Sequence, residues 1–382
     1  MHVRHLSVTD FRSWSGAELA LEPGPNVLIG SNGQGKTNLV EALGYLATLG
    51  SHRVAGDAPL IRAGADRAVA QAAVVADGRE LRIEVEIASG RANRARINGA
   101  PVPRPREILG ILRTVMFAPE DLAIPRGDPS DRRRFLDELV LARAPRLAGV
   151  RADYERVLKQ RGALLKSAAA ARRGGDLRTL DVWDGHLAEH GAQILRARIA
   201  AVRALRPYAA AAYAHVAPAS AALSLRYVST VQPSLPQPAD AEADVPDAAV
   251  LRDALLAELA KARVAELDRG VNLVGPHRDE LDLGIGQLPV RGYASHGECW
   301  SVALALRLGS YELLRADGLP GGDPVLILDD VFAELDVERR DQLALTAAKA
   351  EQSLVTAAVP ADVPSGLLGV RYDVRREGIT RD

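Results

Sequence analysis

The stretch "LIGSNGQGKTNLVEAL", residues 28–43, contains two glycines separated by four residues, with lysine and threonine directly after the second. The first glycine, Gly30, ends the apolar run "NVLIG", which predicts a buried strand, and residues 36–49 have the pattern of a helix. A glycine-rich turn between a strand and a helix lets backbone N–H groups converge on phosphate oxygens, and the helix N-terminus adds a positive dipole. The stretch therefore predicts a phosphate-binding loop.

The residue types in this loop suit a nucleoside triphosphate bound with a magnesium ion. Lys36 can place a point charge on the β- and γ-phosphates, and the hydroxyl of Thr37 can bind Mg²⁺. The expected nucleotide contacts are Gly30, Ser31, Asn32, Gly33, Gln34, Gly35, Lys36, Thr37 and Asn38. Because the chain has no Asn-Lys-x-Asp sequence for reading guanine, the expected cofactors are ATP and Mg²⁺. The alternative is a turn that only joins a strand to a helix.

An acidic pair far along the chain is the expected partner of this loop. In "VLILDD", residues 325–330, four apolar residues predict a central strand that ends at Asp329. Asp329 can hold Mg²⁺, and Asp330 can orient or deprotonate the attacking water. Alone, the segment would be a strand ending in an acidic turn. With the loop, it predicts an ATP hydrolysis site in which Lys36 and Asp330 act on the nucleotide.

A third motif, "YASHGECWSVALALRLGSYELL" at residues 293–314, places Ser295 and Gly297 before a long helix. The order of phosphate loop, Ser-x-Gly helix and acidic strand resembles the ATP-binding-cassette superfamily. There the Ser-x-Gly loop contacts the γ-phosphate of ATP held by the other subunit. The resemblance implies a catalytic role for Ser295 and a nucleotide contact for Gly297 across a dimer. The alternative is a simple N-cap at Ser295.

The pattern along the chain predicts an α/β protein with a helical insert. Strands are expected at 3–9, 17–21, 26–30, 68–75, 81–87, 94–97, 222–229, within 278–293, at 325–330 and at 353–359. Helical periodicity runs from about 132 to 206 with a break at Gly174-Gly175, and again over 248–268, while "QPSLPQPADAEADVPD" (232–247) reads as a linker. We expect a cassette-type P-loop ATPase head with a mixed sheet, formed by residues 1–120 and 275–382, and an inserted, mainly helical arm or lid at 121–274.

The composition bounds the class of protein. The chain has 382 residues, of which 47% are apolar and 25% charged, as in ordinary globular proteins of more than one domain. One cysteine, Cys299, excludes an internal disulfide and fits a reducing cytoplasm. Neither a signal sequence nor a long apolar span is present, so we expect a cytoplasmic protein without membrane association. The net charge of −1 means that any nucleic-acid binding uses a local patch or an assembly.

Five blocks, in order, are similar to the RecF family of bacterial recombination-mediator ATPases. They are "SNGQGKTNLVEAL", "FAPEDLAIPRGDPSDRRRFLD", "RGALLK", "VGPHRDEL" and "VLILDDVFAELD", and the resemblance extends to about residue 360. The parts "FAPED" and "GPHRD" have little use in a generic cassette ATPase. RecF proteins resemble the heads of SMC proteins without their long coiled coils, and the insert in this chain is likewise too short for such a coil.

The resemblance implies an ATP-dependent DNA-binding protein with weak, DNA-stimulated ATPase activity. ATP would join two copies into a homodimer, with Glu334, Leu335 and Asp336 near the opposite nucleotide. The dimer would bind single- and double-stranded DNA at gaps and junctions, and act with RecO and RecR in recombinational repair and replication restart. Slow hydrolysis would reset it. Asp330 in place of the usual glutamate fits slow turnover, and Thr356 stands where a cassette ATPase has its switch histidine.

Two other classes of function remain open at this point. One is the nucleotide-binding subunit of another cassette-type ATPase, either of a transporter or of an SMC-like protein. The other is a module in which ATP is only a structural ligand, which the acidic pair at 329–330 argues against.

Basic residues in the helical insert are the candidates for contact with DNA phosphates. They are Arg132, Arg133, Arg134, Lys159, Arg161 and Lys166. Phosphate contacts need only exposed positive side chains, and they carry no base specificity. The alternative is that these residues form solvated helix faces.

Overall fold

The computed structural model describes residues 1–170, 178–235 and 244–382. The predicted break at Gly174-Gly175 and a large part of the predicted linker lie outside these residues. The chain forms two compact units. Unit 1 comprises Met1–Leu122, Tyr208–Ser220 and Trp300–Asp382, and unit 2 comprises Ala123–Pro207 and Ala221–Cys299.

A mixed sheet carries the phosphate loop in unit 1. Its strands are β3 (Gly24–Ile29), β8 (Thr114–Phe117), β12 (Val325–Asp329), β13 (Gln352–Ala357), β14 (Val370–Arg375) and β15 (Gly378–Arg381). Their order is β15-β14-β3-β13-β12-β8, and all neighbours are parallel except β14 and β15. Every residue of β12 and β13 is buried, as expected for central strands that are covered on both faces. The carboxyl ends of β3 and β12 therefore open on the same edge.

Unit 1 also contains a second, antiparallel sheet. It consists of β1 (His2–Phe11), β2 (Trp14–Ala20), β4 (Arg67–Ala76), β5 (Arg79–Ala88), β6 (Arg94–Ile97) and β7 (Ala100–Pro101), in the order β2-β1-β4-β5-β6-β7. Strand β1 alternates between buried and more exposed residues, so Val3, Leu6, Val8 and Phe11 reach the core. The predicted strands in this region are confirmed.

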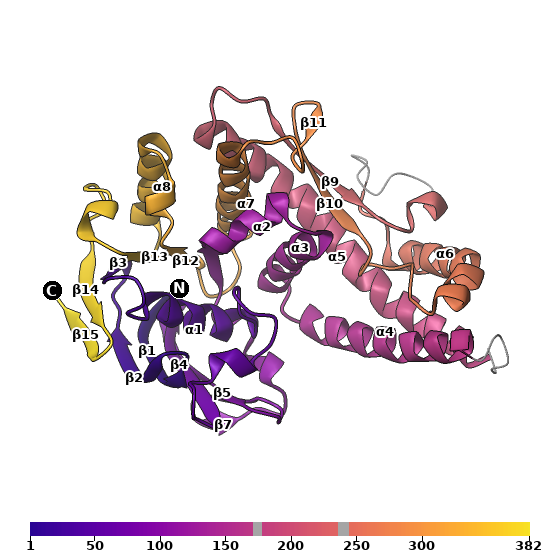
Figure 1. Ribbon diagram of the computed structural model, residues 1–382, viewed down its shortest axis with the longest axis horizontal. Coiled ribbons are helices and arrows are strands. Elements are labelled where there is room, and N and C mark those ends of the chain that lie inside the picture. The colour runs from indigo at the N-terminus through magenta and orange to yellow at the C-terminus, as the bar shows by residue number, and fades with distance from the viewer. Residues whose placement is uncertain (171–177, 236–243) are drawn as a thin grey trace. The chain divides into compact units, whose positions relative to one another are not determined.

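Helices cover the mixed sheet of unit 1. Helix α1 (Lys36–Thr48) contacts strands of both sheets (Figure 1), and its apolar residues join the core between them. Helix α8 (Val337–Lys349) packs against β3 and β13, and Figure 1 places it on the side of the sheet away from α1. The phosphate loop thus joins a buried strand to a buried helix, which fixes both of its ends.

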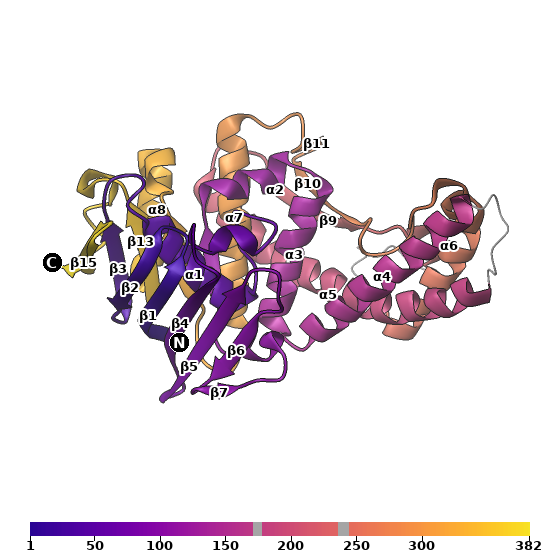
Figure 2. The same ribbon diagram turned by 60° about the horizontal axis from the view of Figure 1, so that its bottom comes forward.

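Unit 2 is helical with a small sheet. Its helices are α2 (Ala123–Arg126), α3 (Pro129–Arg143), α4 (Leu147–Ala170), α6 (Ala248–Arg269) and the first part of α5 (Arg178–Val216). Strands β9 (Leu223–Val228), β10 (Glu280–Ile285) and β11 (Leu288–Pro289) form an antiparallel sheet in the order β11-β10-β9. Helices α4, α5 and α6 lie alongside one another (Figure 2). Helix α7 (His296–Ala316) begins in unit 2 and continues in unit 1.

The observed division differs from the predicted one at its second boundary and within the expected insert. Residues 275–299 were expected in the head but lie in unit 2, because β10 pairs antiparallel with β9 over the register Glu280↔Val228 to Ile285↔Leu223. Tyr208–Ser220, expected in the insert, lie in unit 1, since α5 continues past Pro207 without ending. Within the described residues, none of the helices is both long and apolar enough to cross a membrane.

Candidate functional site

The phosphate loop has the backbone shape that its glycines predict. Gly33 and Gly35 have φ values of +82° and +99°, in the left-handed region where a Cβ atom is unfavourable. At Gly30 an added Cβ would lie 2.3 Å from the carbonyl oxygen of Val374 on β14, so no side chain fits. Ser31, Asn32 and Gly33 are exposed. The loop is therefore held at its ends and open to a ligand at its centre.

Lys36 lies beneath this loop. Its side chain is buried, with 3% exposure, and Nζ donates to the carbonyl oxygen of Gly30 at 2.7 Å. The Lys36 side chain thus reaches back across the loop from the start of α1 to Gly30, the first residue of the loop. A buried ammonium group held by one neutral acceptor is well placed to meet an anion, since charge-assisted hydrogen bonds to phosphate are stronger than those to a carbonyl group.

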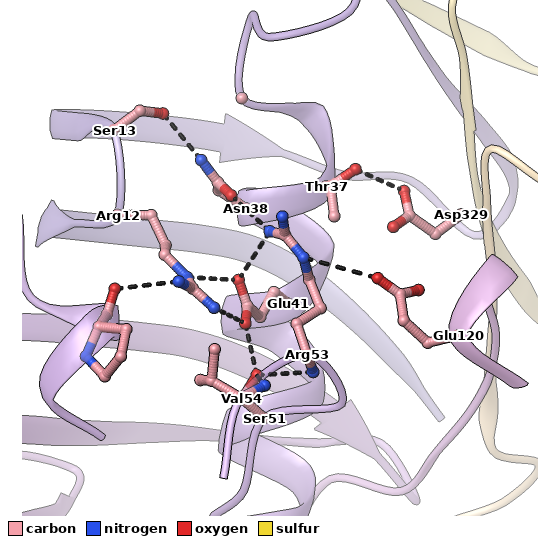
Figure 3. A network of polar contacts seen from close by, with 12 residues as sticks. Arg12, Ser13, Thr37, Asn38, Glu41, Ser51, Arg53, Val54, Glu120 and Asp329 are labelled. Carbon is pink, nitrogen blue, oxygen red and sulfur yellow. Dashed lines mark hydrogen bonds and ion pairs between the residues drawn. The ribbon is translucent and has the colours of Figure 1, made fainter. Parts of the chain in front are cut away.

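The two residues predicted to hold Mg²⁺, Thr37 and Asp329, come together across the sheet. Thr37 Oγ1 donates to Asp329 Oδ1 at 3.1 Å, from the start of α1 to the end of β12 (Figure 3). Burial raises the pKa of Asp329 to about 6, and the neighbouring charge of Asp330 adds to that rise. A hydroxyl and a buried carboxylate at a phosphate loop are the hard oxygen donors that Mg²⁺ takes together with phosphate oxygens and water. The residues present therefore fit a magnesium ion.

Asp330 and Thr356 complete the carboxyl edge of the mixed sheet. Thr356 Oγ1 donates to Asp329 Oδ1 at 2.6 Å and accepts from the backbone N–H of Asp330 at 2.9 Å. Asp330 follows β12 directly and is half-buried. The structure thus brings Lys36, Thr37, Asp329 and Asp330 to one edge, as predicted, and adds Thr356 to them.

A buried carboxylate organises the other side of α1 (Figure 3). Glu41 accepts two hydrogen bonds from Arg12, at 2.5 and 2.8 Å, and one from Ser51 at 2.5 Å. Burial alone would raise the pKa of Glu41, but the hydrogen bonds from Arg12 and Ser51 hold it below its usual value. This network ties the turn after β1 and the loop after α1 to the helix that begins at the phosphate loop.

Arg53 connects that network to the loop itself. Its Nη1 donates to Asn38 Oδ1 at 3.1 Å, and its Nε lies 3.7 Å from a carboxylate oxygen of Glu120 (Figure 3). Asn38 in turn donates to Ser13 Oγ at 2.8 Å. Asn38 was predicted to contact the nucleotide, whereas Arg53 was not, because a single arginine in an irregular loop carries no periodic signal.

Two further residues next to the loop were not assigned to it from the sequence. Trp14 donates its indole N–H to the carbonyl oxygen of Gly35 at 3.1 Å, and a Cβ at Gly35 would lie 2.7 Å from that nitrogen. Arg376, in the turn between β14 and β15, donates its backbone N–H to Gln34 Oε1 at 2.9 Å. The sequence of residues 360–382 contains no motif that predicts this contact.

Ser295 and Gly297 lie in unit 2, at the start of α7. Ser295 Oγ accepts from the N–H of Glu298 at 3.2 Å, and Glu298 Oε2 accepts from the N–H of Ser295 at 2.8 Å. This reciprocal pair is a capping box, which satisfies two backbone donors at a helix start. The N-cap alternative is therefore present in the structure, and any contact with a nucleotide would be additional to it.

The structure removes two of the six basic residues that were expected to contact DNA. Arg132 is buried and forms a paired contact with Glu280, at 2.7 and 2.9 Å. Arg161 is fully buried, with 0% exposure, and donates to Asp184, Glu266 and Asn272. Because neither guanidinium reaches solvent, both serve the interior of unit 2 and cannot bind a phosphate there.

The other four basic candidates differ in exposure. Arg133 is half-buried and donates to the carbonyl oxygen of Asp279 at 2.9 Å. Arg134 is exposed and lies 3.4 Å from Glu138, one turn along α3. Lys159 and Lys166 are exposed on α4. They lie two turns apart on one helix face, about 10 Å along its axis.

The motif "VGPHRDEL" proves to be a buried polar junction in unit 2. Asp279 accepts hydrogen bonds from Tyr227 and Ser229 and from both the N–H and the hydroxyl of Thr230. His277 pairs with the hydroxyl of Tyr154 at 2.7 Å, and burial lowers the pKa of His277 to about 4. Neutral His277 and fully bonded Asp279 thus fasten the loop before β10 to α4 and β9.

Comparisons with known proteins agree with these motifs. A family model described as the RecF/RecN/SMC N terminal domain matches residues 2–363. The chain is 60% identical over 384 residues to the DNA replication and repair protein RecF of Frankia alni, and 58% identical over 385 residues to that of Streptomyces avermitilis, with 100% of both chains covered in each case.

The fold agrees as well. A solved structure of the recombination mediator protein RecF-ATP in the RecFOR pathway superposes with a TM-score of 0.87 at 27% identity, covering 100% of this chain and 97% of that chain. The similarity confirms the predicted α/β ATPase head with an inserted helical arm. The chain therefore belongs to the RecF family of DNA replication and repair proteins, within the wider group of RecF, RecN and SMC head domains.

Proposed function

We propose that this chain is an ATP-dependent DNA-binding protein with weak ATPase activity. The observation that carries the proposal is the contact of 3.1 Å between Thr37 and Asp329 beside the buried Lys36. The loop residues Gly30 to Asn38 would hold the phosphates, and Thr37 and Asp329 would hold Mg²⁺. The solved relative named RecF-ATP supports ATP as the nucleotide. Isothermal titration with ATP and Mg²⁺ tests this step, and absence of binding would overturn it.

Hydrolysis would depend on Asp330. The magnesium ion supplies positive charge for the phosphates when it is bound. Asp330, directly after the residue that holds the ion, would orient or deprotonate the attacking water. Aspartate is one methylene shorter than the glutamate of most cassette ATPases, which fits slow turnover that DNA stimulates.

Dimerisation is the second part of the proposal. Ser295 and Gly297 at the N-terminus of α7 would contact the γ-phosphate of ATP held by a second copy. Near β12, Glu334 and Asp336 are exposed, and Val337 has 72% exposure, although Leu335 is buried.

Replacing Ser295 with aspartate separates its two roles. Aspartate is as good an N-cap as serine, but it puts a negative charge where the opposing γ-phosphate is expected. We expect Ser295→Asp to bind ATP normally and to remain monomeric with ATP and Mg²⁺, whereas neutral Ser295→Asn dimerises. Multi-angle light scattering measures the mass. A Ser295→Asp protein that dimerises like wild type would leave Ser295 with the capping role alone.

DNA binding is the third part. The closed dimer would bind single- and double-stranded DNA at gaps and junctions in the cytoplasm, and act with RecO and RecR in recombinational repair and replication restart. The name of the solved relative, which places it in the RecFOR pathway, supports these partners. Among the basic residues predicted from the sequence, the exposed Arg134, Lys159 and Lys166 remain candidates for phosphate contact.

Reversing the charge of the two exposed lysines of α4 tests that surface. Lys159→Glu with Lys166→Glu is expected to weaken DNA binding and to reduce the slope of log K against log salt by about two, because each lost phosphate contact removes about 0.9. The control is Lys261→Glu with Lys349→Glu, which changes net charge equally elsewhere. Fluorescence anisotropy at several salt concentrations gives both slopes. Equal slopes for the two double variants would place the DNA on another surface.

The alternatives are less well supported. The relatives from Frankia alni and Streptomyces avermitilis, which align over their full length, are named as DNA replication and repair proteins rather than as transporter subunits. The acidic pair at the sheet edge argues against ATP as a structural ligand only, because such a ligand needs no residue to activate water.

A further inference from the structure

The residue expected to activate water stands in a strained backbone conformation. Asp330 has a φ of 50°, which a residue with a Cβ atom rarely adopts outside turns and functional sites. It follows β12 directly, at the edge of the sheet where the phosphate loop also begins. Such a conformation persists only where neighbouring groups hold it in place.

Thr356 is the group that holds it. Strands β12 and β13 are parallel, and their register sets Thr356 opposite Asp329. The Thr356 hydroxyl accepts the backbone N–H of Asp330 at 2.9 Å and donates its own proton to Asp329 Oδ1 at 2.6 Å. One side chain thus fixes both the backbone of one acidic residue and the carboxylate of the other.

We propose that Thr356 is a positioning residue for ATP hydrolysis, which sets the direction of the Asp330 carboxylate. The inference rests on the proposed function, because it concerns the same site. Thr356 touches neither nucleotide nor water in this role. It fixes the backbone N–H of Asp330, and this sets the direction of the Cα–Cβ bond of that residue.

The chemistry of the hydroxyl group explains why threonine suits this position. The site needs an acceptor for an N–H and a donor for a carboxylate, and a hydroxyl offers both from one oxygen. Valine has nearly the same shape but offers neither. Serine keeps the oxygen and loses only a methyl group. The side chain is fully buried, so water cannot take the place of the missing hydroxyl without rearrangement.

The affinity for the ATP phosphates should depend less on Thr356 than the rate does, although Thr356 also donates to Asp329, the expected Mg²⁺ ligand. The phosphates would be held by the loop and by Lys36, which reach the edge from β3 and α1 rather than from β13. Loss of the hydroxyl should therefore affect the chemical step more than the affinity. A side chain that only stabilised the fold would instead change affinity and turnover together, in proportion to the loss of folded protein.

The test compares Thr356→Val with Thr356→Ser and with a matched control, Ser353→Ala. Ser353 is a buried hydroxyl on the same strand, and it donates to the carbonyl oxygen of Ala347 at 2.9 Å, away from the acidic pair. In the full-length protein with Mg²⁺, titration calorimetry gives the Kd for ATP and single-turnover phosphate release gives the rate. Thermal unfolding reports the folded fraction for each variant.

We expect Thr356→Val to keep the ATP Kd within about threefold of wild type and to lose about tenfold or more in rate, as misplaced catalytic groups do. Thr356→Ser and Ser353→Ala should stay within about threefold in both. A wild-type rate in Thr356→Val would overturn the role of Thr356 without affecting the proposed ATPase activity. The role would also be overturned if affinity and rate fell in parallel and Thr356→Ser did not restore them. Wild-type protein that releases no phosphate would overturn the proposed ATPase activity, and this assignment with it.

Discussion

Lys36→Ala is expected to lower the affinity for ATP by at least about 100-fold, since hydrogen bonds to a charged group contribute about 1.5–3 kcal/mol each and the lysine can serve two phosphates. The structure gives a specific reason for an effect of this size. Lys36 is buried beneath the loop and already donates to Gly30 at 2.7 Å, so its amino group needs no large movement to meet a phosphate.

The matched control for this variant is Lys349→Ala, which removes an exposed lysine from the end of α8 in the same unit. Titration calorimetry with ATP and Mg²⁺ measures both affinities. Thermal unfolding should show that Lys36→Ala remains folded, because the lost side chain has only one neutral partner among the described residues. An affinity within threefold of wild type would mean that ATP does not bind at this loop.

Arg161→Met is expected to lower the stability of unit 2 by about 3–5 kcal/mol, as is usual when one member of a buried ion pair is removed. Arg161 donates to Asp184 at 2.5 Å and to Glu266 at 2.6 Å, and both carboxylates are buried. Methionine fills much of the same volume but leaves Glu266 with a buried charge and no cation among the residues that the structure describes.

Urea unfolding of the full chain measures this effect, with Lys159→Met as the control on the exposed face of the same helix. Exposed substitutions usually change stability by less than about 0.5 kcal/mol. The double variant Arg161→Met with Glu266→Gln should recover part of the loss, because the orphaned charge is gone. If Arg161→Met unfolds at the same urea concentration as wild type, the buried cluster contributes little to stability.

The phosphate loop and the acidic strand were predictable because their signals are local. The loop consists of consecutive residues, and Gly33 and Gly35 are needed for a backbone shape that the neighbouring residues define. Asp329 follows an apolar run long enough to predict a central strand, so its place at the carboxyl edge follows from the rule for parallel sheets.

The burial of the basic residues in the insert was harder to predict, because it depends on partners far along the chain. Arg161 and Lys159 look alike in sequence, but the partners of Arg161 lie 23 and 105 residues away. A similar distance hides the pairing of Arg132 with Glu280, 148 residues apart. Nothing in the local pattern of charge distinguishes an arginine that contacts solvent from one that closes a buried cluster.

Strand pairing was the other feature that could not be predicted from the sequence. Strands within residues 278–293 were expected, but the pairing of β10 with β9 decides which unit they join. Thr356 was noted only as a replacement for a histidine. Its contacts with both acidic residues depend on the register of β12 and β13, which a single strand pattern cannot give.

ATP is proposed to control DNA binding, and the affinity for a gapped duplex with different nucleotides shows whether it does. Fluorescence anisotropy with a gapped duplex at about 0.15 M salt, near physiological screening, compares the wild type with Mg²⁺ and ATP, with Mg²⁺ and ADP, and without nucleotide. We expect ATP to lower the Kd by about tenfold or more, within the usual range of coupling between two sites, and Lys36→Ala to show no such change. A wild-type Kd that is the same in all three conditions would mean that ATP does not control DNA binding.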